Sequence, residues 1–157
     1  MVNAVAYIRN GAYAVVGLIW FAQKDGSNET EVYGNISNVS SGEHGLHIHQ
    51  YGDLSRGCES FGPHFNPYNH THGGPTDKVK HVGDFGNVVA DANDTVHVRL
   101  TVDSLEFSGK NSILGRGIVL HEGKDDLGKG DTPDSKLTGN SGARLACGVI
   151  GWAAEEL

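Results

Sequence analysis

Hydrophobic and polar residues alternate along most of the chain, in short segments that end at turn sequences such as Asn10-Gly11 and Asp25-Gly26. Side chains of a β-strand point alternately to its two faces, so this two-residue period is typical of strands with one buried face. Asn-Gly between two such segments is among the strongest short-range signals for a β-hairpin. The pattern predicts eight strands, over residues 2–9, 13–23, 31–37, 45–50, 81–90, 95–100, 113–121 and 145–152.

Two long stretches, residues 51–80 and 122–143, lack this period and are rich in Gly, Pro, Asn and Asp. Loops of this length inside a compact domain are uncommon unless they are tied down or carry a function. No window shows a helical period, and neither an internal repeat nor a linker divides the chain. We therefore predict one all-β domain over residues 1–157, an eight-stranded Greek-key β-barrel or sandwich with two long functional loops.

The composition of the chain narrows its class and its partners. It has 157 residues, 38% hydrophobic and 20% charged, and its 23 glycines fit many tight turns between short strands. The formal net charge of -7 argues against a protein that tracks nucleic-acid phosphates or binds anionic membranes. No run reaches the ~18 apolar residues that a membrane-spanning helix needs. We expect neither nucleic acid nor a membrane among the partners.

The compartment is less clearly indicated. The apolar residues 12–22 follow Arg9 as the core of a signal peptide would, but no small-residue cleavage site comes after them, which favours a strand. We therefore expect a cytoplasmic protein. An extracellular location stays open because the chain has five Asn-x-Ser/Thr sequons, at Asn28, Asn35, Asn38, Asn69 and Asn93. Two isolated cysteines, Cys58 and Cys147, are usually free thiols in the cytosol, although a disulfide is an alternative.

Candidate chemistry begins at His47 and His49. On a strand these two side chains point to the same face, while Leu46 and Ile48 point to the other, which we interpret as the core. A pair of imidazoles suits zinc or copper. On this pair alone, two solvated histidines on an edge strand are an equally good interpretation.

The other metal-type residues make the metal interpretation much stronger. One set lies along a loop and its return strand: His64, His72, His81 and Asp84. Three nitrogens and one oxygen at a closed, loop-borne site resemble structural zinc. The remaining set lies on predicted strands: His47, His49 and His121. An all-imidazole set with an open position suits a redox copper.

These residues fall in motifs that are specific in combination. They read Gly-Leu-His47-Ile-His49, Gly-Pro-His64-Phe-Asn-Pro, His72-Gly-Gly-Pro, His81-Val-Gly-Asp84, His121-Glu-Gly-Lys-Asp125-Asp126-Leu-Gly-Lys-Gly and Gly-Asn-Ser-Gly-Ala-Arg144-Leu-Ala-Cys147-Gly-Val-Ile-Gly. The chain closely resembles the copper/zinc superoxide dismutases over essentially its whole length. The resemblance implies an oxidoreductase that converts superoxide to dioxygen and hydrogen peroxide. A non-catalytic domain that binds or delivers copper and zinc is the alternative.

The resemblance also implies one copper and one zinc ion per subunit. Copper would be held by His47, His49, His64 and His121, and zinc by His64, His72, His81 and Asp84. His64 would bridge the two ions through both ring nitrogens. Asp125 would link His49 to His72 as a ligand-orienting acceptor, and His44 would brace the site by hydrogen bonds.

Further residues receive roles by the same resemblance. Cys58 and Cys147 would form the disulfide of the family. Arg144 would lie beside copper and attract the anionic substrate. Lys124 and Lys136 are candidates for longer-range steering, because Leu137 stands where many members carry a lysine. The family usually forms homodimers and takes copper from a delivery chaperone. Its dimer face would include Val5, Tyr7, Gly52, Ile113, Leu114 and Ile150.

Overall fold

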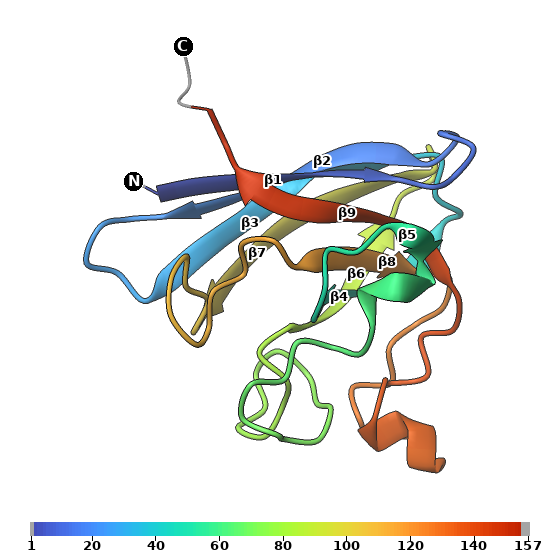
Figure 1. Ribbon diagram of the computed structural model, residues 1–157. Coiled ribbons are helices and arrows are strands. Elements are labelled where there is room, and N and C mark those ends of the chain that lie inside the picture. Colours follow the sequence, from blue (N-terminus) through green and yellow to red (C-terminus); the bar gives the residue numbers. More distant parts are fainter. Residues whose placement is uncertain (1, 155–157) are drawn as a thin grey trace.

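The computed structural model describes residues 2–154. Its strands are β1 (Val2–Arg9), β2 (Val16–Gln23), β3 (Glu29–Ser37), β4 (Gly42–His49), β5 (Ser55–Cys58), β6 (Asp84–Ala90), β7 (Thr95–Asp103), β8 (Gly117–His121) and β9 (Arg144–Trp152) (Figure 1). Two short 3-10 helices, η1 (Glu59–Phe61) and η2 (Pro133–Lys136), lie in the long loops. Among these residues no helix has the length and apolar character to cross a membrane.

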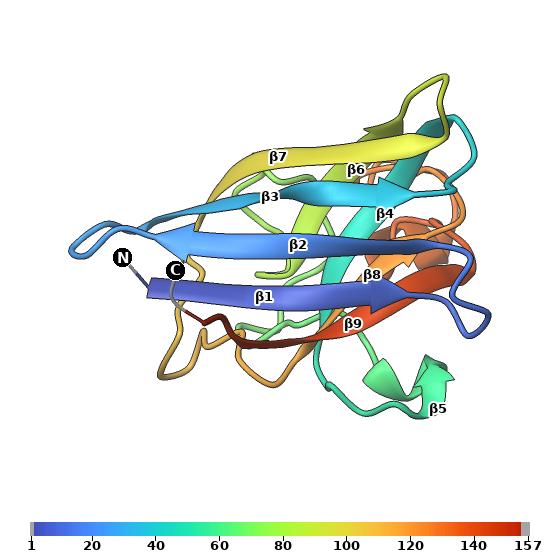
Figure 2. The same cartoon turned by 90° about the horizontal axis from the view of Figure 1, so that it is seen from above.

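The strands close into a barrel in the order β1-β2-β3-β7-β6-β4-β8-β9, with every paired strand antiparallel. Figure 2 shows β1, β2, β3 and β7 side by side in one layer, with β4 and β6 crossing behind them at another angle. The β6–β7 pairing holds only one residue pair, Ala90 with Val96, so the barrel is close to a sandwich there. The chain passes from β3 across the barrel to β4, and the predicted Greek-key, all-β fold is confirmed.

Differences from the predicted strands have local causes. Residues 13–15 do not extend β2, because the Asn10 side chain accepts the backbone N–H of Ala14 at 2.9 Å and Tyr13 has a positive φ of 56°. The starts of β6 and β8 also come later than predicted, since residues 81–83 and 113–116 belong to loops. Within the stretch 51–80, β5 and η1 were not predicted, because elements of four and three residues leave no measurable period.

The inner faces of the strands build one hydrophobic core. Ile19, Phe21, Leu46 and Ile48 are fully buried in it, as the alternation predicts. His47 and His49 point to the opposite face of β4 and are nevertheless 0% and 1% exposed. Figure 1 shows why: both long loops lie on the same side of the barrel, beside β4, β6 and β8.

The prediction that Ile113 and Ile150 belong to a dimer face is wrong. Ile113 and Ile150 are fully buried in the core of the single chain, so their side chains contribute nothing to its surface. Tyr7 is half exposed, and Leu114 is partly buried against the core. The sequence shows only that these residues are apolar, and apolar residues near an edge serve either surface or core.

A disulfide between Cys58 and Cys147 ties the first long loop to β9, as predicted. The loop continues into η1, where Phe61 is fully buried against Val119 and Cys147. Phe61 fits there because Gly117 has no side chain: a Cβ at that position would lie 2.0 Å from the ring. The start of the loop is therefore pinned by a covalent bond and by a buried ring.

We expect Cys58→Ser to lower the free energy of unfolding by up to about 4–5 kcal/mol, because the disulfide closes a loop of about 90 residues in the unfolded chain. It should also weaken zinc retention, since the loop that carries His64 is released at one end. Denaturant titration and dialysis against a chelator measure the two effects. Cys147→Ser should match Cys58→Ser, and the double variant should lose no more than either. Wild-type stability and zinc affinity in Cys58→Ser would contradict the prediction.

Candidate metal centre

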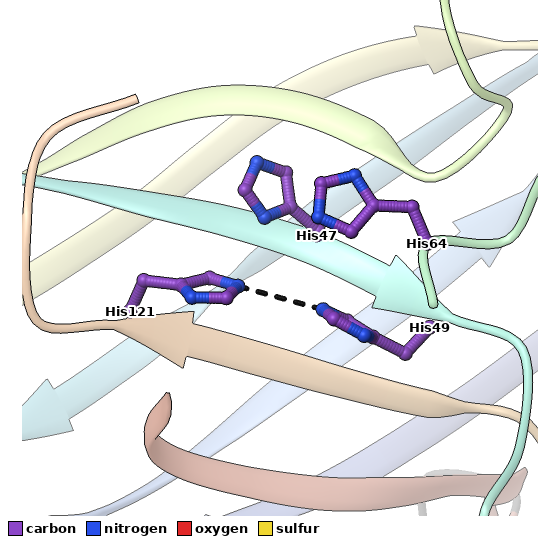
Figure 3. Close-up of side chains that lie close together, drawn as sticks. All are labelled: His47, His49, His64 and His121. Atoms are coloured by element: carbon purple, nitrogen blue, oxygen red, sulfur yellow. Dashed lines mark hydrogen bonds between the residues drawn. The ribbon is translucent and has the colours of Figure 1, made fainter. Parts of the chain in front are cut away.

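Four histidines converge between the barrel wall and the long loops (Figure 3). His47 and His49 come from β4, His121 ends β8, and His64 lies in the loop after η1. An isolated antiparallel bridge between His49 and His64 holds that loop against the end of β4. All four side chains are buried, and their candidate ligand atoms lie within 4.8 Å of one another. We call this set the four-histidine group.

Hydrogen bonds fix the free nitrogen in two of these rings. His49 Nδ1 lies 2.7 Å from the carbonyl oxygen of Gly62, and His121 Nδ1 lies 3.1 Å from that of Gly142. A carbonyl only accepts, so each neutral ring donates through Nδ1 and keeps a lone pair on Nε2. The two Nε2 atoms are 3.4 Å apart (Figure 3). Two lone pairs that face each other at this distance suit a cation that both can bind.

A second set, the three-histidine–aspartate group, consists of His64, His72, His81 and Asp84. His64 Nδ1 and His72 Nδ1 lie 3.1 and 3.0 Å from Oδ1 of Asp84. His81 Nδ1 lies 3.3 Å from the same oxygen and 3.1 Å from His64 Nδ1. A tetrahedral Zn²⁺ with ligands at ~2.0–2.1 Å keeps them ~3.3 Å apart. The spacing of these donor atoms therefore fits zinc.

His64 belongs to both groups. His47 also comes close to the second group, but its Nε2 is 2.8 Å from Asp125 Oδ2, which leaves only Nδ1 for a metal. The Nδ1 of His64 faces Asp84 and His81, and within residues 2–154 its Nε2 has no hydrogen-bond partner. His64 is therefore the ring that can serve two ions, provided that both of its nitrogens are deprotonated.

Asp125 connects the two groups by a second route. Its Oδ2 accepts the Nε2–H of His47 at 2.8 Å, and its Oδ1 accepts the Nε2–H of His72 at 2.8 Å. The prediction that Asp125 links His49 to His72 is wrong in one partner, because His49 donates to Gly62 instead. The carboxylate holds the Nε2–H of both rings, so that Nδ1 is the nitrogen of each ring that can bind a metal.

Two ring nitrogens of these groups lack a hydrogen-bond partner within residues 2–154. Among the described residues, His47 Nδ1 and His72 Nδ1 are buried without a hydrogen-bond partner. His72 Nδ1 is close to Asp84 Oδ1, yet not in hydrogen-bond geometry. A buried polar atom without a partner costs about 1–3 kcal/mol. One such nitrogen lies in each group, and a cation in each would satisfy both.

Burial sets the protonation of the rings. It lowers the pKa of His47 to about 3 and that of His121 to about 4, so both are neutral and can bind a metal. His72 differs: burial lowers its pKa, but its hydrogen bond to Asp125 and the negative charge of the adjacent Asp84 outweigh this and raise it to about 9. A metal ion there must displace that proton, and it would take over the favourable position between two carboxylates.

Arg144 lines a cavity of about 760 Å³ whose wall also includes His64 and His121. Its guanidinium donates to the carbonyl oxygens of Cys58 and Gly62, both at 2.8 Å. The Gly62 carbonyl is also the acceptor of His49, so one peptide group orients both the arginine and a histidine. The disulfide residue Cys58 thus helps to hold Arg144 at the cavity wall.

The two candidate steering lysines are placed differently. Lys136 is exposed and lines the cavity, and its carbonyl oxygen accepts the backbone N–H of His72 at 2.8 Å. Lys124 does not line the cavity and forms an exposed ion pair with Glu43 at 3.0 Å. Of the two lysines, Lys136 alone lines the cavity.

Two supporting residues complete the site. His44 is buried, and its ring nitrogens lie 2.9 Å from the carbonyl oxygen of His121 and 2.7 Å from that of Ser40. Asn87 was not predicted, yet its side chain bonds both the backbone N–H and the carbonyl of Asp125, at 2.7 and 2.9 Å. A single Asn on a strand gives no sequence signal for this role.

Comparisons with known proteins agree with this geometry. The sequence profile described as copper/zinc superoxide dismutase (SODC) matches residues 15–150. The chain belongs to the copper/zinc superoxide dismutase family. It is 49% identical over 152 residues to "Superoxide dismutase [Cu-Zn]" of Saccharomyces cerevisiae, covering 96% of this chain and 98% of that protein. Copper and zinc are thus the metals of the family, and the two groups suit them.

Two further comparisons concern compartment and fold. The chain is 47% identical over 155 residues to "Extracellular superoxide dismutase [Cu-Zn]" of Brugia pahangi, covering 97% of this chain and 77% of that protein. The crystal structure of the clock protein EA4 superimposes with a TM-score of 0.92 at 46% identity, covering 96% of this chain and 94% of that one. The sequence comparisons therefore show the family, and the structural comparison shows the same fold in a second protein.

We expect Asp125→Asn to weaken binding of both metals about 10–100-fold, because the amide can accept only one of the two ring N–H groups. Competition with a chelator, followed by metal analysis, measures both affinities. Asp131→Asn, an exposed residue of the same loop, serves as the control and should bind both metals as the wild type does. Loss of one metal alone would contradict the role of Asp125 as a link between the groups.

Proposed function

We propose that this chain dismutates superoxide with the residues described above: two superoxide anions and two protons give dioxygen and hydrogen peroxide. The observation that carries the proposal is His64, whose ring belongs to both metal groups. His47, His49, His64 and His121 would hold copper, and His64, His72, His81 and Asp84 would hold zinc. When bound, copper supplies one-electron exchange in both directions, and zinc supplies a fixed positive charge.

The chain's own residues supply binding and proton transfer. Arg144 presents a permanently charged guanidinium at the cavity wall, where it attracts and orients a small anion. His64 Nε2 can take up a proton in one half-reaction and give it to the peroxide in the other. Asp125 and the Gly62 carbonyl keep the neighbouring rings in fixed tautomers, so that only His64 changes its proton.

The alternative is a domain that binds or delivers copper without turnover. Its specific expectation is an incomplete copper set, whereas here all four histidines and Arg144 are present and converge. Turnover by the metal-loaded protein separates the two.

We expect His121→Ala to lower superoxide consumption per protein by about 100-fold or more, because the four-histidine group loses one of its ligands. Pulse radiolysis or a competitive superoxide assay gives the rate, and metal analysis gives the occupancy. His97→Ala, an exposed histidine outside both groups, is the matched control. A wild-type protein that binds both metals yet consumes no superoxide would support the delivery domain instead.

Steering of the anion is the role we propose for Lys136. Lys136→Glu should slow the reaction about 2–5-fold at ~10 mM ionic strength and very little at ~0.5 M, because exposed charges are screened by salt. Lys124→Glu carries the same charge change away from the cavity and should have a smaller effect. Rates measured from low to high salt test this, and equal curves for the two variants would remove Lys136 from the mechanism.

We further propose that residues 1–157 act as one domain and form a homodimer. Tyr7 and Leu114 would contribute to its face, together with Trp152, which is 63% exposed and stacks on Phe107. Sedimentation at twice the 16.7 kDa chain mass would support the dimer, and sedimentation as a 16.7 kDa monomer would contradict it.

We also propose a copper-delivery chaperone as a partner, because candidate ligands such as His47 are buried. Faster copper loading with the chaperone than with free copper would support this.

The compartment has two candidates. We propose the cytoplasm, in line with the missing cleavage site after residues 12–22. One observation favours the extracellular alternative: all five sequon asparagines, Asn28, Asn35, Asn38, Asn69 and Asn93, are exposed. A mass shift of the native protein on treatment with an N-glycosidase would establish passage through the secretory pathway, and no shift would support the cytoplasm.

A further inference from the structure

Among residues 2–154, the partly buried guanidinium of Arg116 has two hydrogen bonds and one ring contact, and no counter-ion. Its Nε donates to the carbonyl oxygen of Ser112 at 2.7 Å, and its Nη1 donates to that of Gln50 at 3.0 Å. Its Cζ lies 3.8 Å from the centre of the Phe65 ring. Within residues 2–154, no carboxylate forms an ion pair with it. The charge is therefore held by two peptide carbonyls and one aromatic face.

Two of these three contacts fall next to a candidate copper ligand. Gln50 directly follows His49, and Phe65 directly follows His64. Phe65 is only 3% exposed, so its ring has little freedom once the guanidinium covers one face. Arg116 therefore contacts both segments that carry these histidines, in each case at the residue that follows the histidine.

The backbone continues the connection. Gly117, the residue after Arg116, is paired across the sheet with His49, and β8 then runs from Gly117 to His121. Arg116 thus stands at the start of the strand that ends in a third histidine of the group. Its own carbonyl accepts the backbone N–H of Ile150 at 2.9 Å, which fixes it to β9.

The two loop segments also bond each other directly. Gln50 N–H donates to the carbonyl of Pro63 at 2.9 Å, and Phe65 N–H donates to that of Ile48 at 2.8 Å. These bonds set the spacing of the backbones. The Arg116 side chain adds contacts outside this backbone bonding, to the Gln50 carbonyl and to the Phe65 ring.

We propose that Arg116 is a positioning residue for the four-histidine group, which clamps the His49 and His64 segments together from the side away from the cavity. Arg116 does not line the cavity, so it acts through these two histidines and not on the substrate. The inference rests on the proposed function, because it assumes that the group holds copper.

Lysine cannot reproduce the clamp. A guanidinium is planar, donates in fixed directions and stacks on an aromatic face, whereas an ammonium is a compact, strongly hydrated point charge. Arg116→Lys therefore keeps the charge and loses both the stack and at least one directed hydrogen bond. Phe65→Leu removes the other half of the stack and keeps an apolar side chain in the core.

The test compares the wild type, Arg116→Lys, Phe65→Leu and the double variant, each purified and loaded with zinc and copper(II). We expect copper(II) affinity to fall about tenfold or more in each single variant. The electron paramagnetic resonance and visible ligand-field spectra of bound copper should shift, because they report ligand geometry. Both substitutions break the same contact, the stack of Arg116 on Phe65. The loss of copper(II) affinity in the double variant should therefore be smaller than the sum of the losses in the two single variants.

Arg9→Lys is the matched control, because Arg9 also lies over an aromatic ring, that of Tyr13 at 4.6 Å, in an exposed hairpin outside both metal groups. Its copper spectra and affinity should equal those of the wild type. Wild-type spectra and affinity in Arg116→Lys and Phe65→Leu, with or without a lower melting temperature, would overturn the proposal. Should one variant not fold, the other decides in the same way. A wild type that binds no copper would instead refute the proposed function.

Discussion

Seven of the nine histidines are buried between the barrel wall and the two long loops, and the rest of the site follows from the need to partner their ring nitrogens. Burial of a polar atom is unfavourable unless it is hydrogen-bonded or bound to a metal. One nitrogen of each key ring is assigned by the protein, to the carbonyl of Gly62 or Gly142 or to the carboxylate of Asp125. The other ligand nitrogens lie close to one another, and a cation among them would partner those that have no hydrogen bond.

This requirement explains why the two loops are long and ordered without much secondary structure. Each must supply partners at several places, and a regular helix or strand would offer its polar groups to itself. The second loop delivers Asp125 between the two metal groups, and it returns to bond the backbone N–H of His72 through Lys136. The first loop carries His64 and is anchored by the disulfide at Cys58. Order in the loops and order in the metal groups therefore depend on each other.

The sequence predicts the barrel because a two-residue hydrophobic period is a direct consequence of strand geometry. It predicts the donor set because few residue types can bind these metals. The sequence does not predict that Asp125 bonds His47 and not His49. The pairing register of β4 with β6 shifts between Gly45 and His47, and the carboxylate reaches His47 across 78 residues of sequence. No local pattern encodes which of two nearby rings a distant loop will meet.

The sequence does not predict the positioning role of Arg116, for a related physical reason. Its acceptors, at Ser112 and Gln50, are backbone carbonyls, which every residue has, so no side-chain pattern marks them. Arg144 also bonds carbonyls but lies in a motif that the resemblance identifies. The functional difference between the two arginines comes from position alone. One faces the cavity and the other faces away from it, which only the fold determines.

Position also distinguishes the charged side chains of this protein. Its net charge of -7 would repel an anion, so the charges near the cavity matter most. Lys124 and Lys129, outside the cavity, are paired with Glu43 and Asp77. Arg144 and Lys136 line the cavity, and within residues 2–154 neither forms an ion pair. In the described part of the chain, Asp134 is the one carboxylate in that wall. Because the field of nearby unpaired charges is stronger than that of paired or distant ones, we expect these two cations to favour the approach of a small anion to the cavity despite the net negative charge.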